Sequence, residues 1–239
     1  MKVLSIGNSF SQDAHAYLHG VCDAAGIEIY AANLYIGGCS LVRHYKNYEN
    51  DMRDYLYEVN GISTGEHMSL AEGLAREDWD VVTLQEASGR SGEISHYEPY
   101  IYDLIKIIKQ ACPRAKIALH STWGYDERLL HNMKNLGFFS PDEMFMQVEA
   151  TYLEVKKRCG ADILIPSGAV INRLRKEGYY THYEGQHASR GIGRYALALT
   201  WLKTLHGVNV KGNSFRDFSV FISQEEIEAA QRAVDEIVR

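Results

Sequence analysis

A serine, a histidine and a glutamate occupy positions in this sequence from which they could carry out acyl transfer. Ser9 follows a short apolar run, and His187 stands three residues after Glu184, ahead of a long helical pattern. A serine hydroxyl becomes an effective nucleophile when a histidine accepts its proton, and a carboxylate fixes the tautomer of that histidine. The sequence therefore offers Ser9 as nucleophile, His187 as general base and Glu184 as the acid.

Acyl transfer also requires hydrogen-bond donors that face the oxyanion of the tetrahedral intermediate, and loss of one donor typically lowers turnover ~100- to 1000-fold. The candidates are the backbone N–H groups of Ser9 and Gly38 and the side-chain amide of Gln85. Gly38 suits this task because a residue without a side chain lets the backbone approach a substrate. Trp123 follows the apolar run that ends at His120, and His44 follows the glycine pair Gly37-Gly38. We expect both to contact substrate.

Ten histidines raise the question of a metal site, but their spacing does not support one. A His-Glu-x-x-His motif is absent, and His182 and His187 lack a convincing third ligand. Gly191-Ile192-Gly193 lies within a helical pattern, whereas a dinucleotide-binding turn would follow a strand. Neither a GxxxxGK phosphate loop nor a Gly-x-Ser-x-Gly elbow occurs. We expect no metal and no cofactor.

Short β-branched runs alternate with longer segments of helical periodicity, which is typical of βα units and a mostly parallel sheet. The expected strands are residues 3–6, 27–34, 80–84, 116–120 and 162–165. The expected helices are residues 13–25, 70–76, 99–111, 142–159, 190–206 and 224–238. This order predicts one α/β domain over residues 1–239, with three layers around a central sheet of about five strands.

Residues 39–65 have no clear period apart from strand-like alternation in 55–59, and we interpret them as an insertion over one end of the sheet. In open α/β sheets, ligands bind beyond the carboxyl ends of the strands. Ser9, Gly38 and Gln85 each follow an expected strand, and His187 precedes an expected helix. The topology therefore predicts that these residues meet at one edge of the sheet.

The composition is that of an acidic globular protein. The chain has 239 residues, with 25 Lys and Arg against 31 Asp and Glu, and a net charge of −6. Without a basic block it is a poor partner for nucleic acid, and no apolar run is long enough to span a bilayer. A strand-like start where a signal peptide would be more apolar predicts a cytoplasmic protein, unless a leader has been removed. We expect reduced thiols at the four scattered cysteines, Cys22, Cys39, Cys112 and Cys159.

Together these segments resemble the SGNH/GDSL hydrolase superfamily, which is named after its serine, glycine, asparagine and histidine blocks. Gly7-Asn8-Ser9-Phe10 resembles its Gly-Asp-Ser-Leu turn, Gly37-Gly38 its glycine block, and Glu184 with His187 its histidine block. Two departures are that Leu84-Gln85-Glu86 stands where Gly-x-Asn-Asp is usual, and that Glu184 replaces an aspartate. The chain is similar to an uncharacterised branch that carries Gly-Asn-Ser-Phe and Leu-Gln-Glu blocks.

The resemblance implies a flavodoxin-like α/β/α sandwich and a metal-independent serine esterase. Such an enzyme would hydrolyse small O-acyl esters through an acyl-enzyme, and carbohydrate O-acetyl groups are one substrate class. Each segment alone also has a purely structural interpretation, but the four in this order favour a hydrolase. Two alternatives remain open: a non-catalytic carbohydrate-binding protein on the same fold, and a flavodoxin-like binder of nucleotide or phosphate around residues 7–9.

Overall fold

A seven-stranded sheet forms the centre of the computed structural model, which describes all residues 1–239. The strands lie in the order β4-β3-β2-β1-β5-β6-β7. Their bounds are β1 (Lys2–Gly7), β2 (Tyr30–Tyr35), β3 (Tyr55–Val59), β4 (Ile62–Met68), β5 (Val81–Leu84), β6 (Lys116–His120) and β7 (Ile163–Ile165). A separate antiparallel hairpin consists of β8 (His182–Tyr183) and β9 (His187–Ala188).

The five expected strands are all present, and they pair in parallel. β1 pairs with β2 on one side and with β5 on the other, and β6 and β7 continue from β5. The chain moves from β1 out to β2 and later returns to β5, so the topology switches direction at β1. Ligand sites of open α/β sheets form beyond the carboxyl ends of the strands at such a switch point. Ser9 follows β1 and therefore lies at this position.

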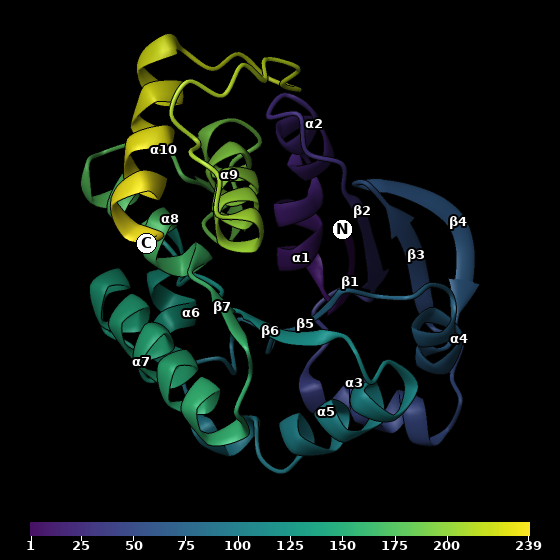
Figure 1. Ribbon diagram of the computed structural model, residues 1–239. Helices are drawn as coiled ribbons and strands as arrows, with labels where there is room; N and C mark the ends of the chain where they lie inside the picture. Colours follow the sequence, from purple (N-terminus) through teal and green to yellow (C-terminus); the bar gives the residue numbers. More distant parts are fainter.

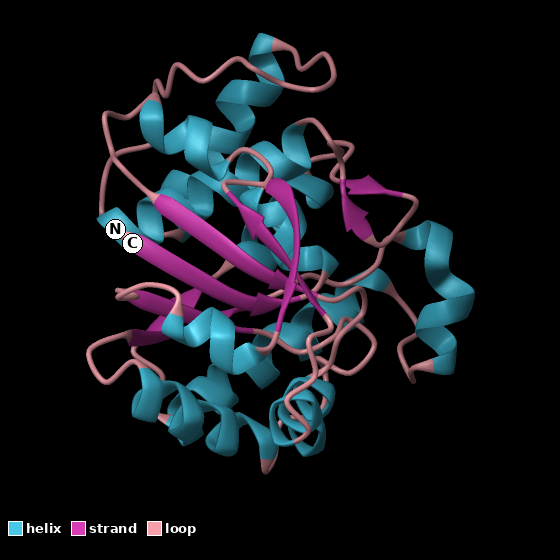
Figure 2. Cartoon of the chain, turned by 90° about the vertical axis from the view of Figure 1, so that its right-hand side faces the viewer, coloured by secondary structure: helices cyan, strands magenta, loops and turns pink.

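Helices cover both faces of the sheet, which gives the molecule three layers (Figures 1 and 2). One face carries α1 (Ser9–His15), α2 (Leu18–Asp23), α8 (Ser167–Lys176), α9 (Ile192–His206) and α10 (Gln224–Ile237). The other carries α3 (Leu41–Glu49), α4 (Leu70–Ala75), α5 (Tyr100–Ala111), α6 (Leu130–Asn135) and α7 (Pro141–Cys159). Short 3-10 helices are η1 (Ile94–His96) and η2 (Glu127–Leu129). Successive strand residues such as Val3 and Leu4 enter opposite apolar cores, as strand geometry requires.

Residues 39–65 do not cover an end of the sheet, so this expectation is wrong. They form α3, β3 and the start of β4, and the antiparallel pair β3–β4 extends the sheet beside β2. Most of β4 is exposed, and Ile62 is the one large apolar side chain on its exposed part. Such an edge strand lacks the alternation of apolar and polar residues by which strands are recognised.

The single helix expected over residues 13–25 is divided into α1 and α2. Tyr17 interrupts it with φ of −120° and ψ of 2°. The Tyr17 hydroxyl donates to the Arg190 carbonyl at 2.5 Å and lies 2.8 Å from Ser219 Oγ. These partners are distant in sequence, so local periodicity could not indicate the break.

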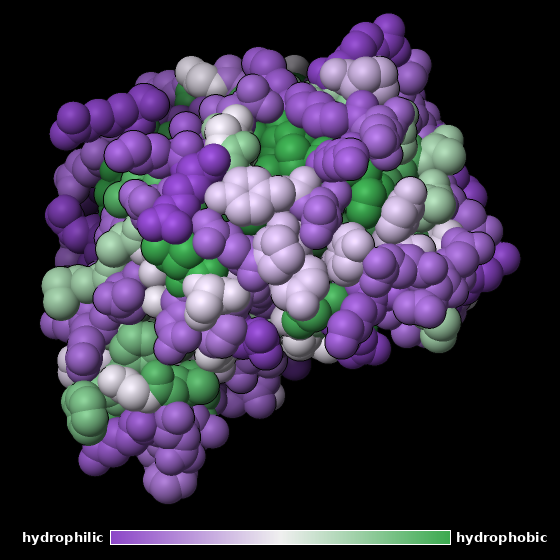
Figure 3. Space-filling model, turned by 90° about the horizontal axis from the view of Figure 1, so that it is seen from below, coloured by the Kyte–Doolittle hydropathy of each residue, from purple (hydrophilic) through white to green (hydrophobic).

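The surface over α3, α5 and α7 is mostly hydrophilic, and its apolar side chains form separate small patches (Figure 3). No helix combines the length and the apolar composition that a membrane span requires.

Candidate active site

A tight turn at the end of the central strand places Ser9. β1 ends at Gly7, where an added Cβ would lie 2.0 Å from Ser11 Oγ, so only glycine fits. Asn8 then caps α1, because its Oδ1 accepts a hydrogen bond from the Phe10 N–H at 3.0 Å. Ser9 becomes the first residue of α1 and is half-buried.

Ser9, His187 and Glu184 form a continuous chain of polar contacts. Ser9 Oγ lies 2.9 Å from His187 Nε2, and His187 Nδ1 lies 3.2 Å from Glu184 Oε1. With a proton on Nδ1, the imidazole donates to the carboxylate and leaves Nε2 to accept the serine proton. The structure thus brings together the three residues that the sequence suggests as nucleophile, base and acid.

Glu184 lies in the turn of the β8–β9 hairpin, in an unusual backbone conformation. Its φ is 47°, and Gly185 follows with φ of 88°. Residues other than glycine adopt the left-handed region only where the surrounding structure holds them there. The Glu184 side chain is 59% exposed, whereas that of His187 is 31% exposed. The turn therefore brings the longer acid within reach of the imidazole from the solvent side.

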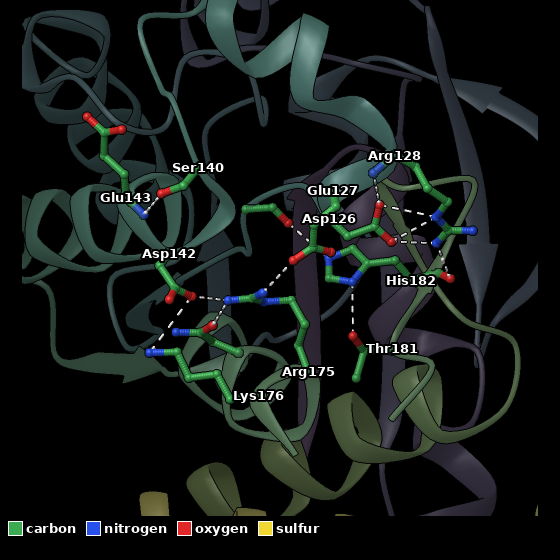
Figure 4. Close-up of polar contacts among 12 residues, drawn as sticks. Asp126, Glu127, Arg128, Ser140, Asp142, Glu143, Arg175, Lys176, Thr181 and His182 are labelled. Atoms are coloured by element: carbon green, nitrogen blue, oxygen red, sulfur yellow. Dashed lines mark hydrogen bonds and ion pairs between the residues drawn. The ribbon is translucent and has the colours of Figure 1, made fainter. Parts of the chain in front are cut away.

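Polar contacts fasten this hairpin to the loop after β6 (Figure 4). Arg128 Nη2 donates to the His182 carbonyl at 2.8 Å and to the Asp126 carboxylate at 2.5 Å. The Asp126 N–H donates to the Gly185 carbonyl at 3.0 Å. Burial lowers the pKa of His182, so this ring is neutral at the base of the hairpin. These contacts hold the hairpin both at its first strand, through His182, and at its turn, through Gly185.

Asp13 joins the His187 segment to the helix that carries Ser9. It lies four residues after Ser9, so the two side chains share one face of α1. Its Oδ2 accepts from the Ala188 N–H at 2.8 Å, and its Oδ1 accepts from Arg194 Nε at 2.9 Å. Burial raises the pKa of Asp13, and the Arg194 guanidinium opposes that shift. No sequence motif marks Asp13; its four-residue spacing from Ser9 is the one signal that could have found it.

Two backbone N–H groups at the site, those of Ser9 and Gly38, are free to donate to a bound group. The Ser9 N–H belongs to the first turn of α1, where no intrahelical acceptor exists. Gly38 is exposed with φ of 61°, and its N–H has no acceptor within the chain. Asn8 Nδ2 donates to the Cys39 carbonyl at 3.0 Å and so ties the Ser9 turn to this glycine loop. The arrangement suits the stabilisation of an oxyanion.

Gln85 lies behind Asn8 and is 1% exposed, which corrects the expectation of an amide that faces substrate. Its Nε2 donates to Asn8 Oδ1 at 2.6 Å, and its Oε1 accepts from His120 Nδ1 at 2.5 Å. His120 Nε2 lies 2.9 Å from Ser167 Oγ. Burial lowers the pKa of His120 to about 3, so the ring is neutral and Nε2 accepts the serine proton. Gln85 therefore orients Asn8, which in turn holds the glycine loop.

Trp123 and His44 are both 0% exposed, so the expected contacts with substrate are wrong. Trp123 stacks on Phe10 with 4.1 Å between ring centroids, and its Nε1–H donates to the Gln186 carbonyl at 2.8 Å. His44 Nδ1 lies 3.0 Å from the Tyr55 hydroxyl, and burial lowers the pKa of His44 to about 3. Trp123 thus supports the residues on either side of the site, whereas His44 belongs to the core under the glycine loop.

Glu86 is a buried carboxylate beside the glycine loop, and sequence reasoning gave it no role. Its Oε1 accepts from the Ala87 N–H at 2.6 Å and from the Leu41 N–H, the first of α3, at 3.3 Å. The side chain has no ion-pair partner within 4.0 Å, and burial raises the pKa of Glu86 to about 7. Glu86 therefore holds the start of α3 while its charge is costly above neutral pH.

This burial predicts a pH-dependent effect of Glu86→Gln on stability. Burial raises the pKa of Glu86 from an ordinary value of 4.5 to about 7. Between pH 4.5 and about pH 7, Glu86 is therefore more fully protonated in the folded protein than in the unfolded chain. The contribution of Glu86 to stability is therefore greatest at low pH and falls as pH rises toward 7. Glutamine keeps a carbonyl acceptor and does not ionise. We expect the free energy of unfolding of the variant, relative to wild type, to rise by a few kcal/mol between about pH 5 and about pH 8.

Urea unfolding at the two pH values measures this difference. Glu28→Gln changes an exposed carboxylate and is the matched control, with no change between the two pH values expected. A Glu86→Gln difference that is the same at both pH values would contradict the burial argument.

No group of three or more His, Cys, Asp or Glu side chains is placed to hold a metal ion. All four cysteines are free thiols. Cys39 lies next to Gly38, but burial raises its pKa to about 12, so this thiol is protonated and is a poor nucleophile.

Comparison with known proteins shows that the chain matches one protein family and that it shares its fold with several other solved structures. Residues 2–236 match the family model described as a domain of unknown function, DUF4886. A DUF4886 family protein from Bacteroides uniformis ATCC 8492 is 33% identical, with a TM-score of 0.92 over 99% of this chain and 93% of that chain. No curated protein matches the sequence.

Two further solved structures share the fold at lower identity. A candidate SGNH hydrolase from Slackia heliotrinireducens is 21% identical, with a TM-score of 0.60 over 86% of this chain and 98% of that chain. An acetylxylan esterase from Geobacillus stearothermophilus is 16% identical, with a TM-score of 0.57 over 86% of this chain and 94% of that chain. The expected α/β fold of SGNH-hydrolase type is therefore confirmed, with a mixed and mostly parallel sheet.

Proposed function

The chain belongs to the DUF4886 family, whose function is unknown, and we propose that it is a metal-independent serine esterase. The observation that carries the proposal is the contact chain in which Ser9 Oγ lies 2.9 Å from His187 Nε2 and His187 Nδ1 lies 3.2 Å from Glu184 Oε1. At these distances a base can take the proton of a nucleophile, while an acid orients that base by accepting a hydrogen bond from it.

The mechanism follows from the positions of these atoms. Ser9 Oγ attacks the ester carbonyl carbon while His187 Nε2 takes the hydroxyl proton, and the N–H groups of Ser9 and Gly38 donate to the resulting oxyanion. The tetrahedral intermediate expels the alcohol, which takes the proton from His187, and leaves an acyl group on Ser9. A water molecule then attacks the acyl carbon with His187 as base, and the carboxylic acid leaves as the Ser9 hydroxyl reforms.

We propose small O-acyl esters as substrates, with O-acetyl groups of carbohydrates as the leading class. The support is the shared fold of the acetylxylan esterase described above, at 16% identity. The partner of the protein is then a small-molecule or carbohydrate ester.

A fluorophosphonate probe tests the proposal, because it forms a covalent adduct only with an activated serine. We expect one adduct per chain by intact mass, and hydrolysis of p-nitrophenyl acetate by the unlabelled protein. A well-folded protein with neither adduct nor hydrolysis would contradict the proposal and favour a carbohydrate-binding protein on this fold.

The Asp13 contacts predict an effect of Asp13→Asn on turnover. The amide retains an acceptor for the Ala188 N–H but leaves Arg194 without its carboxylate, so His187 is held less firmly against Ser9. Misplacement of a catalytic group by about 1 Å can cost on the order of 100-fold. We expect kcat for p-nitrophenyl acetate to fall roughly 10- to 100-fold while KM changes little.

Steady-state kinetics with circular dichroism of the variant checks this expectation. Asp235→Asn is the control. Asp235 of α10 pairs with Lys203 of α9, so this variant also removes an ion pair between α9 and a neighbouring helix, but at a distance from the hairpin. It should keep the wild-type kcat. If Asp13→Asn also keeps the wild-type kcat, Asp13 does not position the base.

A further inference from the structure

A surface hollow of about 390 Å³ opens beside the hairpin that carries His187. Three segments line it: the strand that leads into the hairpin turn, the start of α9, and the loop before α10 together with Glu226 in the first turn of that helix. The residues that matter for its chemistry are Tyr180, Tyr183, Arg190, Val220 and Phe221. None of them has a role in the mechanism described above.

Large apolar side chains gather around this hollow although they are exposed. Phe221 is 91% exposed, Tyr180 58%, Tyr183 43% and Val220 42%. Single exposed apolar residues are ordinary, but a cluster that borders a hollow is typical of a binding surface. The position of Phe221 needs an explanation in particular, because its ring makes almost no contact with the fold.

The pairing of β8 with β9 places the hollow next to the catalytic imidazole. Tyr183 stands directly opposite His187 in the ladder, and His182 stands opposite Ala188. Residues opposite each other in an antiparallel pair project from the same face, with Cβ atoms ~5 Å apart. His182 and Ala188 are both buried, so Tyr183 and His187 share the outer face. The hollow therefore begins beside the group that must protonate the leaving alcohol.

Arg190 supplies the free hydrogen-bond donors of the hollow, whereas the Glu226 carboxylate that also lines it accepts from Ser223. Its guanidinium carbon lies 5.1 Å from the centroid of the Tyr183 ring. Its side chain is exposed and makes no ion pair or hydrogen bond within the chain, whereas Arg128 and Arg194 nearby are both held by carboxylates. Arg190 therefore presents a full set of donors to whatever occupies the hollow.

We propose that this hollow binds a sugar ring of the alcohol part of the ester; the proposal rests on the proposed esterase function. A pyranose has an apolar C–H face, which can stack on Tyr183 and Phe221, and a rim of hydroxyl groups, which can accept hydrogen bonds from Arg190. An alkyl chain would match the aromatic rings but would desolvate the Arg190 donors without replacing their hydrogen bonds. The combination of exposed rings and a free guanidinium thus selects a carbohydrate over a fatty alcohol.

The test compares two esters that differ in the alcohol. On this proposal an O-acetylated xylo-oligosaccharide places a sugar ring in the hollow, whereas p-nitrophenyl acetate carries no sugar ring. In Phe221→Ala and in Arg190→Ala, we expect the ratio of kcat/KM for the oligosaccharide ester to that for p-nitrophenyl acetate to fall about 3- to 10-fold. Phe139→Ala is the matched control, because Phe139 is also an exposed phenylalanine, 69% exposed and placed just before α7, and it should leave the ratio unchanged.

Each outcome has a separate meaning. An unchanged ratio in both hollow variants overturns the sugar site, as does a wild-type protein that hydrolyses p-nitrophenyl acetate but not the oligosaccharide ester. A wild-type protein that hydrolyses neither ester and takes up no fluorophosphonate contradicts the esterase function itself.

Discussion

Ser9→Ala should leave the fold intact and lower the turnover of p-nitrophenyl acetate roughly 10³- to 10⁶-fold. The Ser9 hydroxyl makes one polar contact within the chain, at 2.9 Å to His187 Nε2, so the variant loses at most about 1 kcal/mol of stability. The activity loss is large because no other hydroxyl stands at this position, and water must then attack the ester directly. Intact-mass labelling with the fluorophosphonate should show no adduct in the variant.

Ser214→Ala provides the control for this experiment. Ser214 lies on an exposed loop between α9 and α10, and its side chain makes no hydrogen bond within the chain. The control should retain both the adduct and the hydrolysis. An adduct that persists in Ser9→Ala would place the reactive serine elsewhere and would contradict the assignment of the nucleophile.

Trp123→Ala should destabilise the protein by about 3–5 kcal/mol, the usual cost of removing a large aromatic side chain from a core. Trp123 is fully buried, stacks on Phe10 and donates to the Gln186 carbonyl at 2.8 Å. The cavity left by the missing indole ring would lie under Phe10, which follows Ser9, and beside Gln186, which precedes His187. We expect the folded variant to react more slowly with the fluorophosphonate as well.

Trp79→Ala separates these two effects. Trp79 is also buried, and its Nε1–H donates to the Gly73 carbonyl at 3.1 Å. It precedes β5, so it lies at the amino ends of the parallel strands, whereas Ser9 lies at their carboxyl ends. Urea unfolding should show a similar loss of stability in both variants, whereas the labelling rate of folded protein should fall in Trp123→Ala alone. Equal labelling rates in the two variants would show that Trp123 acts on stability only.

The parallel part of the fold follows from local sequence. The expected strand over residues 116–120 coincides with β6, and the expected helices over 70–76, 99–111, 142–159 and 224–238 differ from the observed ones by one residue at an end. These segments have strong periodicity and marked starts, such as Ser223, which forms a capping box with Glu226. The strand-like alternation in residues 55–59 coincides with β3, whereas the exposed outer strand β4 was missed because its polar residues carry no such pattern.

The residues of the candidate site were easier to find than their surroundings. Ser9 is indicated because it follows an expected strand, and Glu184 and His187 are indicated by their residue types, their three-residue spacing and their place ahead of an expected helix. The burial of Trp123 and Gln85 depends on Phe10 and Asn8, which are more than 70 residues away in sequence. Sequence order places a residue at the edge of a sheet, but whether its side chain faces solvent or core depends on such distant partners.

The large separation in sequence between Ser9 and His187 has a consequence for how an active protein would be made. Ser9 and His187 are 178 residues apart. A ribosome that adds ~5–20 residues per second therefore produces the base roughly 10–40 s after the nucleophile. On the mechanism proposed above, a nascent chain cannot cleave esters until the hairpin has emerged and docked, and a chain truncated before β8 never can. Recovery of hydrolysis after denaturation thus reports the closure of the whole topology.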